Sequence, residues 1–248
     1  MLRRACLILG LIAGIAGSAL AQSDLPQTVV LARLSRVPDQ VIGGEIMTAV
    51  YAKLGIKVEF VDVEAVRALE LSSSGAIDGE IQRIAAVAEQ FPTLIRIATP
   101  VNYIEPAAFT RGLTFPVDGW ASIADFQIGI VRGVGSSERG TKGMLHVQTA
   151  TSLENLILML DHDRFQVMVT DRISGEVSLK KMGLADRIRA LSPPLQRIEL
   201  YHYLNQKHQL LAARVAAVLA EMAASGELAA LRERLVQRVL SGDLAGDP

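Results

Sequence analysis

The chain has 248 residues, half of them hydrophobic, and its 25 basic and 26 acidic side chains give a formal charge of −1. A charge so close to neutral, with no cluster of lysine and arginine, excludes a typical nucleic-acid-binding protein. Cys6 is the only cysteine, and it lies in a segment that we expect to be removed. The mature chain is therefore expected to hold neither a disulfide nor a cysteine metal site.

The N-terminal residues have the pattern of a secretory signal peptide. Arg3 and Arg4 precede an apolar run over residues 5–16, and Ala19-Leu20-Ala21 places small residues at the two positions that a signal peptidase reads. The apolar run is too short for a membrane span. We expect cleavage after Ala21, export across the inner membrane and a periplasmic mature protein that starts at Gln22.

The first part of the mature chain predicts alternating strands and helices. Apolar side chains recur at every fourth residue from Ile42 to Leu54, which predicts a helix with one buried face that Gly55 ends. A second, short helix carries Arg67 and ends in the serine-glycine run 72–75. The predicted strands cover 28–34, 56–63 and 77–81, and the predicted helices 41–54 and 64–71. This β-α-β-α-β order indicates a parallel sheet with helices on its faces.

The middle of the chain starts a second β-α-β series, and the end of the chain is helical. Extended connections near 98–106 and 196–204 bracket the second series. We therefore predict an α/β protein with two lobes joined by two extended crossings, which close like a hinge around a ligand. The predicted domains are lobe 1 at 22–103 and 198–248, and lobe 2 at 104–197.

Two arginines fall just after predicted strands, where ligands bind in open α/β sheets. Arg67 and Arg83 are therefore candidate ligand-binding residues. In the alternative interpretation they form ordinary ion pairs, Arg67 with Glu64 or Glu70, and Arg83 with Asp78 or Glu80.

Asp78 and Glu80 are carboxylates on one face of a strand that would otherwise be apolar. They could serve as an acid/base pair, recognise a cation on a ligand, or pair with the arginines.

A glycine-rich stretch follows the predicted strand at 127–132. Backbone N–H groups at Gly133, Gly135, Ser136 and Ser137 would suit a carboxylate or a phosphate. The third glycine and the acidic residue of a dinucleotide-binding fingerprint do not fall at the right spacing, and a flexible loop is the alternative. Tyr103, near the first crossing, is a candidate to line the cleft or to pack in the core.

No motif for a metal or a catalytic triad is visible. The histidines show no metal-ligand spacing, and we expect them at surface or hinge positions; they are His146, His162, His202 and His208. No serine stands in a nucleophile elbow. We expect neither cofactor nor metal.

Several segments together resemble a known family. They are YAKLG (51–55), IKVEFV (56–61), RALELSSSGAIDGEIQRI (67–84), DFQIGIVRGVGSSE (125–138), LENLILMLDHDRFQVMVT (153–170), YHYLNQKHQLL (201–211) and EMAASGEL (221–228). The whole mature chain is similar to the bacterial extracellular solute-binding proteins of family 3, the periplasmic amino-acid-binding type that serves ABC importers. The resemblance is to a divergent branch, and it implies the type II periplasmic-binding-protein fold, with lobe 1 built from both ends of the chain.

Two departures from the family pattern bear on the ligand. The loop 34–40 after the first strand has no aromatic residue, and the position where the family's ligand-binding arginine would fall is Gln90. In our interpretation Arg83 takes over that role.

The leading hypothesis is a monomeric, non-catalytic binding protein that holds a small anionic or zwitterionic solute for an ABC importer permease. The alternatives are a dehydratase-like enzyme that uses Asp78 or Glu80, and a ligand-sensing partner of a membrane receptor. The predicted ligand-binding set is Arg67, Asp78, Glu80, Arg83, Tyr103, Gly133, Gly135, Ser136 and Ser137.

Overall fold

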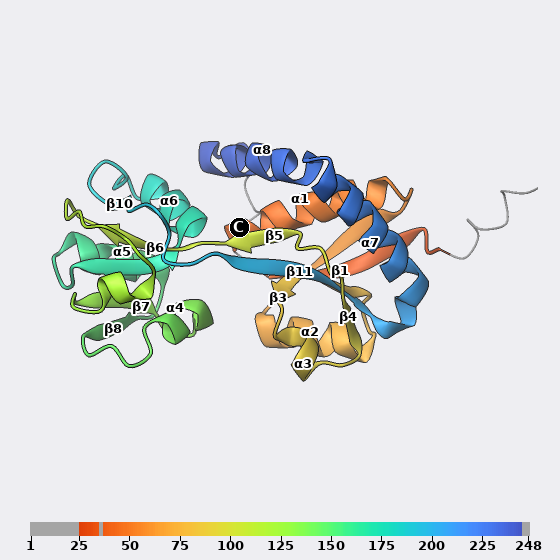
Figure 1. Ribbon diagram of the computed structural model, residues 1–248, viewed down its shortest axis with the longest axis horizontal. Helices are drawn as coiled ribbons and strands as arrows, with labels where there is room; N and C mark the ends of the chain where they lie inside the picture. Colours follow the sequence, from red (N-terminus) through yellow and green to blue (C-terminus); the bar gives the residue numbers. More distant parts are fainter. Residues whose placement is uncertain (1–24, 35–36, 245–248) are drawn as a thin grey trace, which may run out of the picture.

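The computed structural model describes residues 25–34 and 37–244, and it shows two α/β lobes side by side (Figure 1). The expected signal peptide lies outside the described residues. The prediction of an α/β protein with two lobes and two extended crossings is confirmed.

The sheet of lobe 1 combines strands from both ends of the chain. Its order is β2-β1-β3-β11-β4, and β5 pairs with β11. The strands are β1 (Thr28–Leu34), β2 (Lys57–Val63), β3 (Gly79–Ile84), β4 (Leu94–Arg96), β5 (Asn102–Ile104) and β11 (Ile198–Asn205). Strands β1, β2 and β3 run parallel, whereas β11 runs antiparallel to β3.

The helices of lobe 1 cover this sheet. They are α1 (Pro38–Ala52), α2 (Ala65–Ser74), α3 (Val87–Gln90), the short 3-10 helix η2 (Gln206–His208), α7 (Gln209–Ala224) and α8 (Glu227–Ser241). The large core of the lobe lies between the sheet and α1, α7 and α8, with Ile42, Ile46 and Val50 fully buried. The four-residue apolar period of the sequence therefore produced the expected buried face of α1.

Lobe 2 holds the second sheet, in the order β10-β6-β9-β7-β8. Its strands are β6 (Pro106–Thr110), β7 (Ile128–Val131), β8 (Val147–Ala150), β9 (Val167–Asp171) and β10 (Arg189–Ala190). Its helices are the 3-10 helix η1 (Trp120–Ile123), α4 (Gly135–Gly140), α5 (Leu153–Asp161) and α6 (Arg172–Lys181). The predicted boundaries near 103 and 198 fall inside β5 and at the start of β11, and as exact positions they stay a prediction.

Two crossings connect the lobes, one from β5 to β6 and the other leading into β11 (Figure 1). They pair with each other, because Ile104 lies opposite Ile198 in the antiparallel ladder. Arg197 on the second crossing donates from Nε and Nη2 to Glu105 on the first, at 3.0 and 2.7 Å. The crossings therefore form one cross-linked unit.

Strand β3 differs from its predicted range. The sequence placed it at 77–81, but it runs from Gly79 to Ile84. It is buried because it lies between β1 and β11, and a side chain at Gly79 would collide with the backbone carbonyl of Tyr203. Glycine is therefore required at this position of β3 beside β11.

His202 was expected at the surface or hinge, but it is fully buried in β11. Its Nδ1–H donates to the carbonyl of Glu80 at 2.7 Å, and its Nε2 accepts from the hydroxyl of Tyr51 at 2.9 Å. Burial lowers the pKa of His202 to about 4, so the ring is neutral and connects two strands and a helix.

In the described part of the chain, no single helix is long and apolar enough to cross a membrane. The bent pair formed by Gln206–Ala224 and Glu227–Ser241 meets that criterion only when the two are taken together.

Candidate functional site: a cavity between the lobes

A cavity of about 420 Å³ lies between the two lobes. Lobe 1 contributes the end of β3 and the residues after it, lobe 2 contributes η1 and α4, and the second crossing closes one side. The lining residues are Ile84, Ala86, Trp120, Ser136, Arg139, Gly140, Gln196 and Ile198. This volume suits a small organic molecule.

The wall from lobe 2 is built on contact between Trp120 and α4. A side chain at Gly140 would collide with the indole ring, so the ring lies directly on the helix backbone at this glycine. The indole N–H donates to Oε1 of Gln196 at 3.0 Å. This hydrogen bond connects lobe 2 to the second crossing at the edge of the cavity.

Arg139 is the only charged residue among the lining residues. It is exposed, and within the described residues no carboxylate forms an ion pair with it. A guanidinium group that the fold does not engage is available to a carboxylate from outside, and it can bind both oxygens at once.

The glycine-rich loop is only partly available to a ligand. Gly133 has a left-handed φ of 85°, and its N–H donates to Oε1 of Glu138 at 2.7 Å. Helix α4 starts at Gly135, and its N-cap is Val134. Of the four predicted residues in this stretch, only Ser136 lines the cavity.

Gly133 forms the turn before α4 and Gly135 is the first residue of that helix, and neither lines the cavity. Ser137 is buried, with an unpartnered hydroxyl, and it is not among the lining residues. Of the predicted loop residues, the structure therefore brings only Ser136 to the cavity.

Arg83 and Glu80 form a buried ion pair that belongs to the fold. Nε of Arg83 donates to Glu80 at 2.7 Å, and Nη2 donates to the carbonyl of Ala65 at 3.0 Å. Glu80 also accepts from the hydroxyl of Ser72 at 2.8 Å. Burial raises the pKa of Glu80, and the charge of Arg83 opposes that effect. The pair fastens β3 to α2, and neither residue lines the cavity.

Arg67 lies on the outer surface of α2. It donates to Glu70 at 3.0 Å, and both side chains are more than half exposed. The structure therefore places Arg67 in a surface ion pair, which is worth about 0 to 1 kcal/mol.

Asp78 lies at the opposite end of β3 from the cavity. The antiparallel ladder pairs Gly79 with Leu204 and Ile84 with Leu200, so the cavity end of the strand is at Ile84. Asp78 accepts from the N–H of Val30 at 2.8 Å and from Nε2 of His208 at 2.7 Å. Burial favours a raised pKa for Asp78, but these hydrogen bonds and Lys207 hold it below the usual value. Asp78 and Glu80 have separate partners and do not form an acid/base pair.

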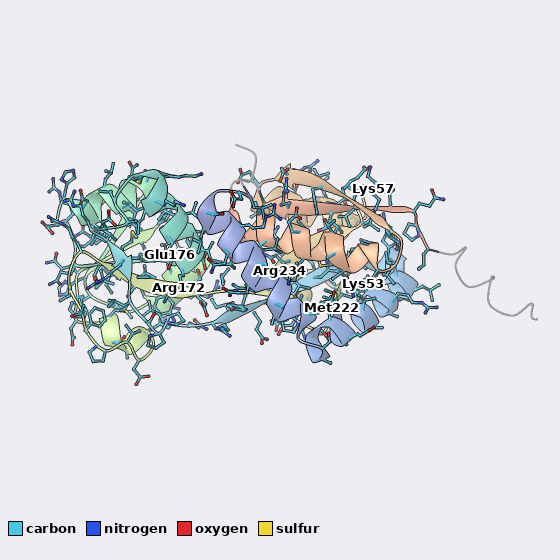
Figure 2. All side chains as sticks on the ribbon, turned by 90° about the horizontal axis from the view of Figure 1, so that it is seen from above. Lys53, Lys57, Arg172, Glu176, Met222 and Arg234 are labelled. Carbon is cyan, nitrogen blue, oxygen red and sulfur yellow. The ribbon has the colours of Figure 1, made fainter. Side chains whose placement is uncertain are left out.

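A second interlobe region surrounds the crossings, and we call it the hinge cluster. It consists of Asp39, Gln82, Asn102, Tyr103, Glu105, Asp171, Arg172, Arg197 and Arg232. Arg172 and Glu176 of α6 lie on the flank of lobe 2 that faces lobe 1 (Figure 2).

Tyr103 is held by two arginines in the hinge cluster. The guanidinium groups of Arg232 and Arg197 lie 3.5 and 4.0 Å from the centre of its ring. Arg232 also donates to Asn102 Oδ1 at 2.7 Å and to the carbonyl of Tyr103 at 3.2 Å. The structure thus places Tyr103 in the hinge, and it does not line the cavity.

Two carboxylates from opposite lobes, the buried Asp39 and the partly buried Asp171, complete the hinge cluster. Asp39, in the first turn of α1, accepts from Nε2 of Gln82 at 2.7 Å. Asp171 caps α6 and accepts from the N–H groups of Glu105 and Ser174 at 3.0 and 3.1 Å. Burial and the nearby charge of Asp171 raise the pKa of Asp39 to about 7, and burial also raises the pKa of Asp171.

Sequence reasoning missed the cavity residues Trp120, Arg139 and Gln196. Two signals were available: Trp120 is the only tryptophan of the chain, and Arg139 follows the glycine-rich loop by two residues. Within the described residues, no group of three or more His, Cys, Asp or Glu could hold a metal ion.

Solved structures share this arrangement at low sequence identity. A histidine kinase sensor domain with similarity to periplasmic binding proteins is 18% identical, with a TM-score of 0.62 over 84% of this chain and 96% of its own. The chain has the periplasmic-binding-protein fold. The ligand-binding core of GluR0 in complex with L-glutamate is 14% identical, with a TM-score of 0.66 over 86% of this chain and 99% of its own.

An ancestral arginine-binding protein bound to glutamine is 15% identical, with a TM-score of 0.62 over 85% of this chain and 98% of its own. These neighbours confirm the predicted fold and are consistent with the resemblance to family 3 solute-binding proteins. No family model matches the chain. An uncharacterized protein of Shewanella oneidensis is 25% identical over 186 residues, which cover 73% of this chain and 70% of that protein.

Proposed function

We propose that this protein captures a small, carboxylate-bearing solute in the interlobe cavity and leaves it chemically unchanged. The observation that carries the proposal is Arg139, the one charged lining residue, which has no ion-pair partner in the described part of the chain. A buried carboxylate needs a matched cation, and a guanidinium offers two parallel N–H donors in the right geometry.

The neighbouring groups support this assignment. The hydroxyl of Ser136 lies on the same helix as Arg139, and the amide of Gln196 lies on the crossing. Because the walls belong to both lobes, movement about the crossings would enclose the solute and strengthen its contact with Arg139 by removing water.

The test is ligand-dependent thermal stabilisation of the mature protein with a panel of small carboxylic acids. A ligand present at about 100 times its Kd adds about 2.7 kcal/mol to the free energy of unfolding. We expect at least one acid to raise the Tm of the wild type, and Arg139→Gln to lose most of that shift. Arg132→Gln is the matched control, because Arg132 is an exposed arginine before the same loop and lies outside the cavity. A panel without any stabilising acid would contradict the proposal.

The partner and the location are part of the proposal. The signal-peptide pattern supports a periplasmic protein, and the family resemblance supports delivery to an ABC importer permease. One structural neighbour is a histidine kinase sensor domain, which favours ligand sensing as the second candidate. Crosslinking of the loaded protein in its own cells, followed by identification of the captured membrane protein, distinguishes a permease from a receptor.

A further inference from the structure

The charge that lines the cavity is of one sign only, positive. Its eight lining residues include one guanidinium group and no carboxylate. Three of them, Ile84, Ala86 and Ile198, are aliphatic and lie in lobe 1 or on the crossing. The cavity therefore offers a partner for one negative charge and an apolar surface opposite it.

Three carboxylates on or near the segments that form the walls are already engaged. Glu80 on β3 accepts from Arg83 and Ser72. Glu138, next to Arg139, accepts from the N–H of Gly133. Glu105, on the first crossing, accepts from Arg197. None of these groups is free to receive an ammonium group from a ligand.

The polar groups that do line the cavity favour an anion. The Oε1 atom of Gln196 is occupied by the indole N–H of Trp120, whereas its amide NH₂ group donates no described hydrogen bond. The hydroxyl of Ser136 can donate. A buried ammonium group without a carboxylate partner would lose its hydration with little compensation.

We propose that the cavity selects a small monocarboxylate with an apolar body and no α-ammonium group, in preference to the amino acid with the same side chain. This inference rests on the proposed function, because it takes the same cavity and the same arginine as the binding site. It separates this protein from neighbours whose structures hold glutamate or glutamine.

The test compares acids with amino acids of the same side chain by isothermal titration calorimetry. The pairs are 4-methylpentanoate with leucine, and 3-phenylpropanoate with phenylalanine. We expect at least one acid to bind at least about tenfold more tightly than its amino acid, a difference of about 1.4 kcal/mol. Arg139→Gln should abolish the binding of that acid, and Arg132→Gln should leave it unchanged.

A variant that adds a carboxylate to the cavity tests whether its absence disfavours amino acids. Ala86 lines the cavity and is the N-cap of α3, a position that accepts aspartate. Ala86→Asp should shift the preference towards the amino acid by about tenfold or more.

The outcomes are distinguishable. If the wild type binds amino acids as tightly as the acids through Arg139, the inference is wrong and the proposed function stands. If it binds neither member of any pair, and the wider acid panel also fails, both are wrong.

Discussion

The hinge cluster and the cavity differ in whether their arginine side chains have partners within the chain. In the hinge cluster, Arg232 stacks on Tyr103 and donates to Asn102, and Arg197 binds Glu105 through two donors. In the cavity, Arg139 has no ion-pair partner among the described residues. A charge that is fully engaged within the chain stabilises the arrangement of the lobes, whereas a charge left open can serve a ligand.

The largest effect is expected for Arg232→Met in the hinge cluster. The substitution removes the hydrogen bonds to Asn102 and Tyr103. It also removes the cation that lowers the pKa of Asp39 and of Asp171. A hydrogen bond made by a charged group contributes about 1.5 to 3 kcal/mol, and the substitution removes two. Urea unfolding of the wild type and the variant measures the change in the free energy of unfolding.

The matched control is Arg234→Met, on an exposed position of the same helix (Figure 2). Its effect should stay within about 0.5 kcal/mol. Equal effects at the two positions would show that Arg232 does not hold the hinge.

The next effect is a pH dependence that originates at Asp39. Its pKa is about 7 in the folded chain against an ordinary value of 3.8. The folded state therefore binds the proton more tightly, so the free energy of unfolding falls as pH rises from about 4 to 7 and levels off above that range. The slope is at most about 1.4 kcal/mol per pH unit. Asp39→Asn should lack this component, so its stability relative to wild type should increase from pH 5 to pH 7.

If the free energy of unfolding depends on pH in the same way for wild type and Asp39→Asn, Asp39 is not the source of the pH dependence. Asp171→Asn is the companion variant. It keeps a side-chain oxygen to cap α6 but removes the neighbouring charge, so the pH midpoint of the Asp39 contribution should move down.

A smaller effect is expected at the cavity wall for Gly140→Ala. The added methyl group collides with the indole of Trp120, and forcing an extra methyl into a packed contact costs about 1 to 3 kcal/mol. It should also weaken acid binding, because the ring must leave its position beside Gln196. Calorimetry and urea unfolding measure the two effects, with Ala121→Ser at an exposed neighbouring position as the control. Unchanged binding would show that the placement of Trp120 does not matter to the ligand.

The smallest effect is expected for Arg67→Gln. The pair with Glu70 is exposed, so stability should change by less than about 1 kcal/mol. Acid affinity should equal that of the wild type. A large loss of affinity would instead restore Arg67 as a ligand-binding residue.

The sequence predicted the fold better than the site, and β3 shows why. The repeating apolar positions of α1 and the glycine that ends it are local signals, and they gave the helix and strand order correctly. The end of β3 was predicted at Ile81, but the strand continues to Ile84 because β11 pairs with it up to that residue. Arg83 therefore lies within the strand beside Glu80, and does not follow its end.

The cavity could not be predicted from local sequence patterns, because it too depends on contacts between distant segments. Its walls come from positions near 85, 120, 139 and 197, and only the packing of the two lobes brings them together. Of the four residues predicted in the glycine-rich loop, only Ser136 lines the cavity. The N–H groups of the loop could not be assigned, because the contact between Gly133 and Glu138 depends on how α4 starts.

The indole of Trp120 gives the molecule a built-in optical probe. It is the only tryptophan in the chain, it lines the cavity, and its N–H spans from lobe 2 to the crossing. Tryptophan emission of the unlabelled protein, excited at wavelengths that tyrosine does not absorb, therefore comes from one known place. Its emission wavelength and quenching by iodide report directly on whether the cavity is wet or filled. Rapid mixing would then give the rates of solute entry and exit without any chemical modification.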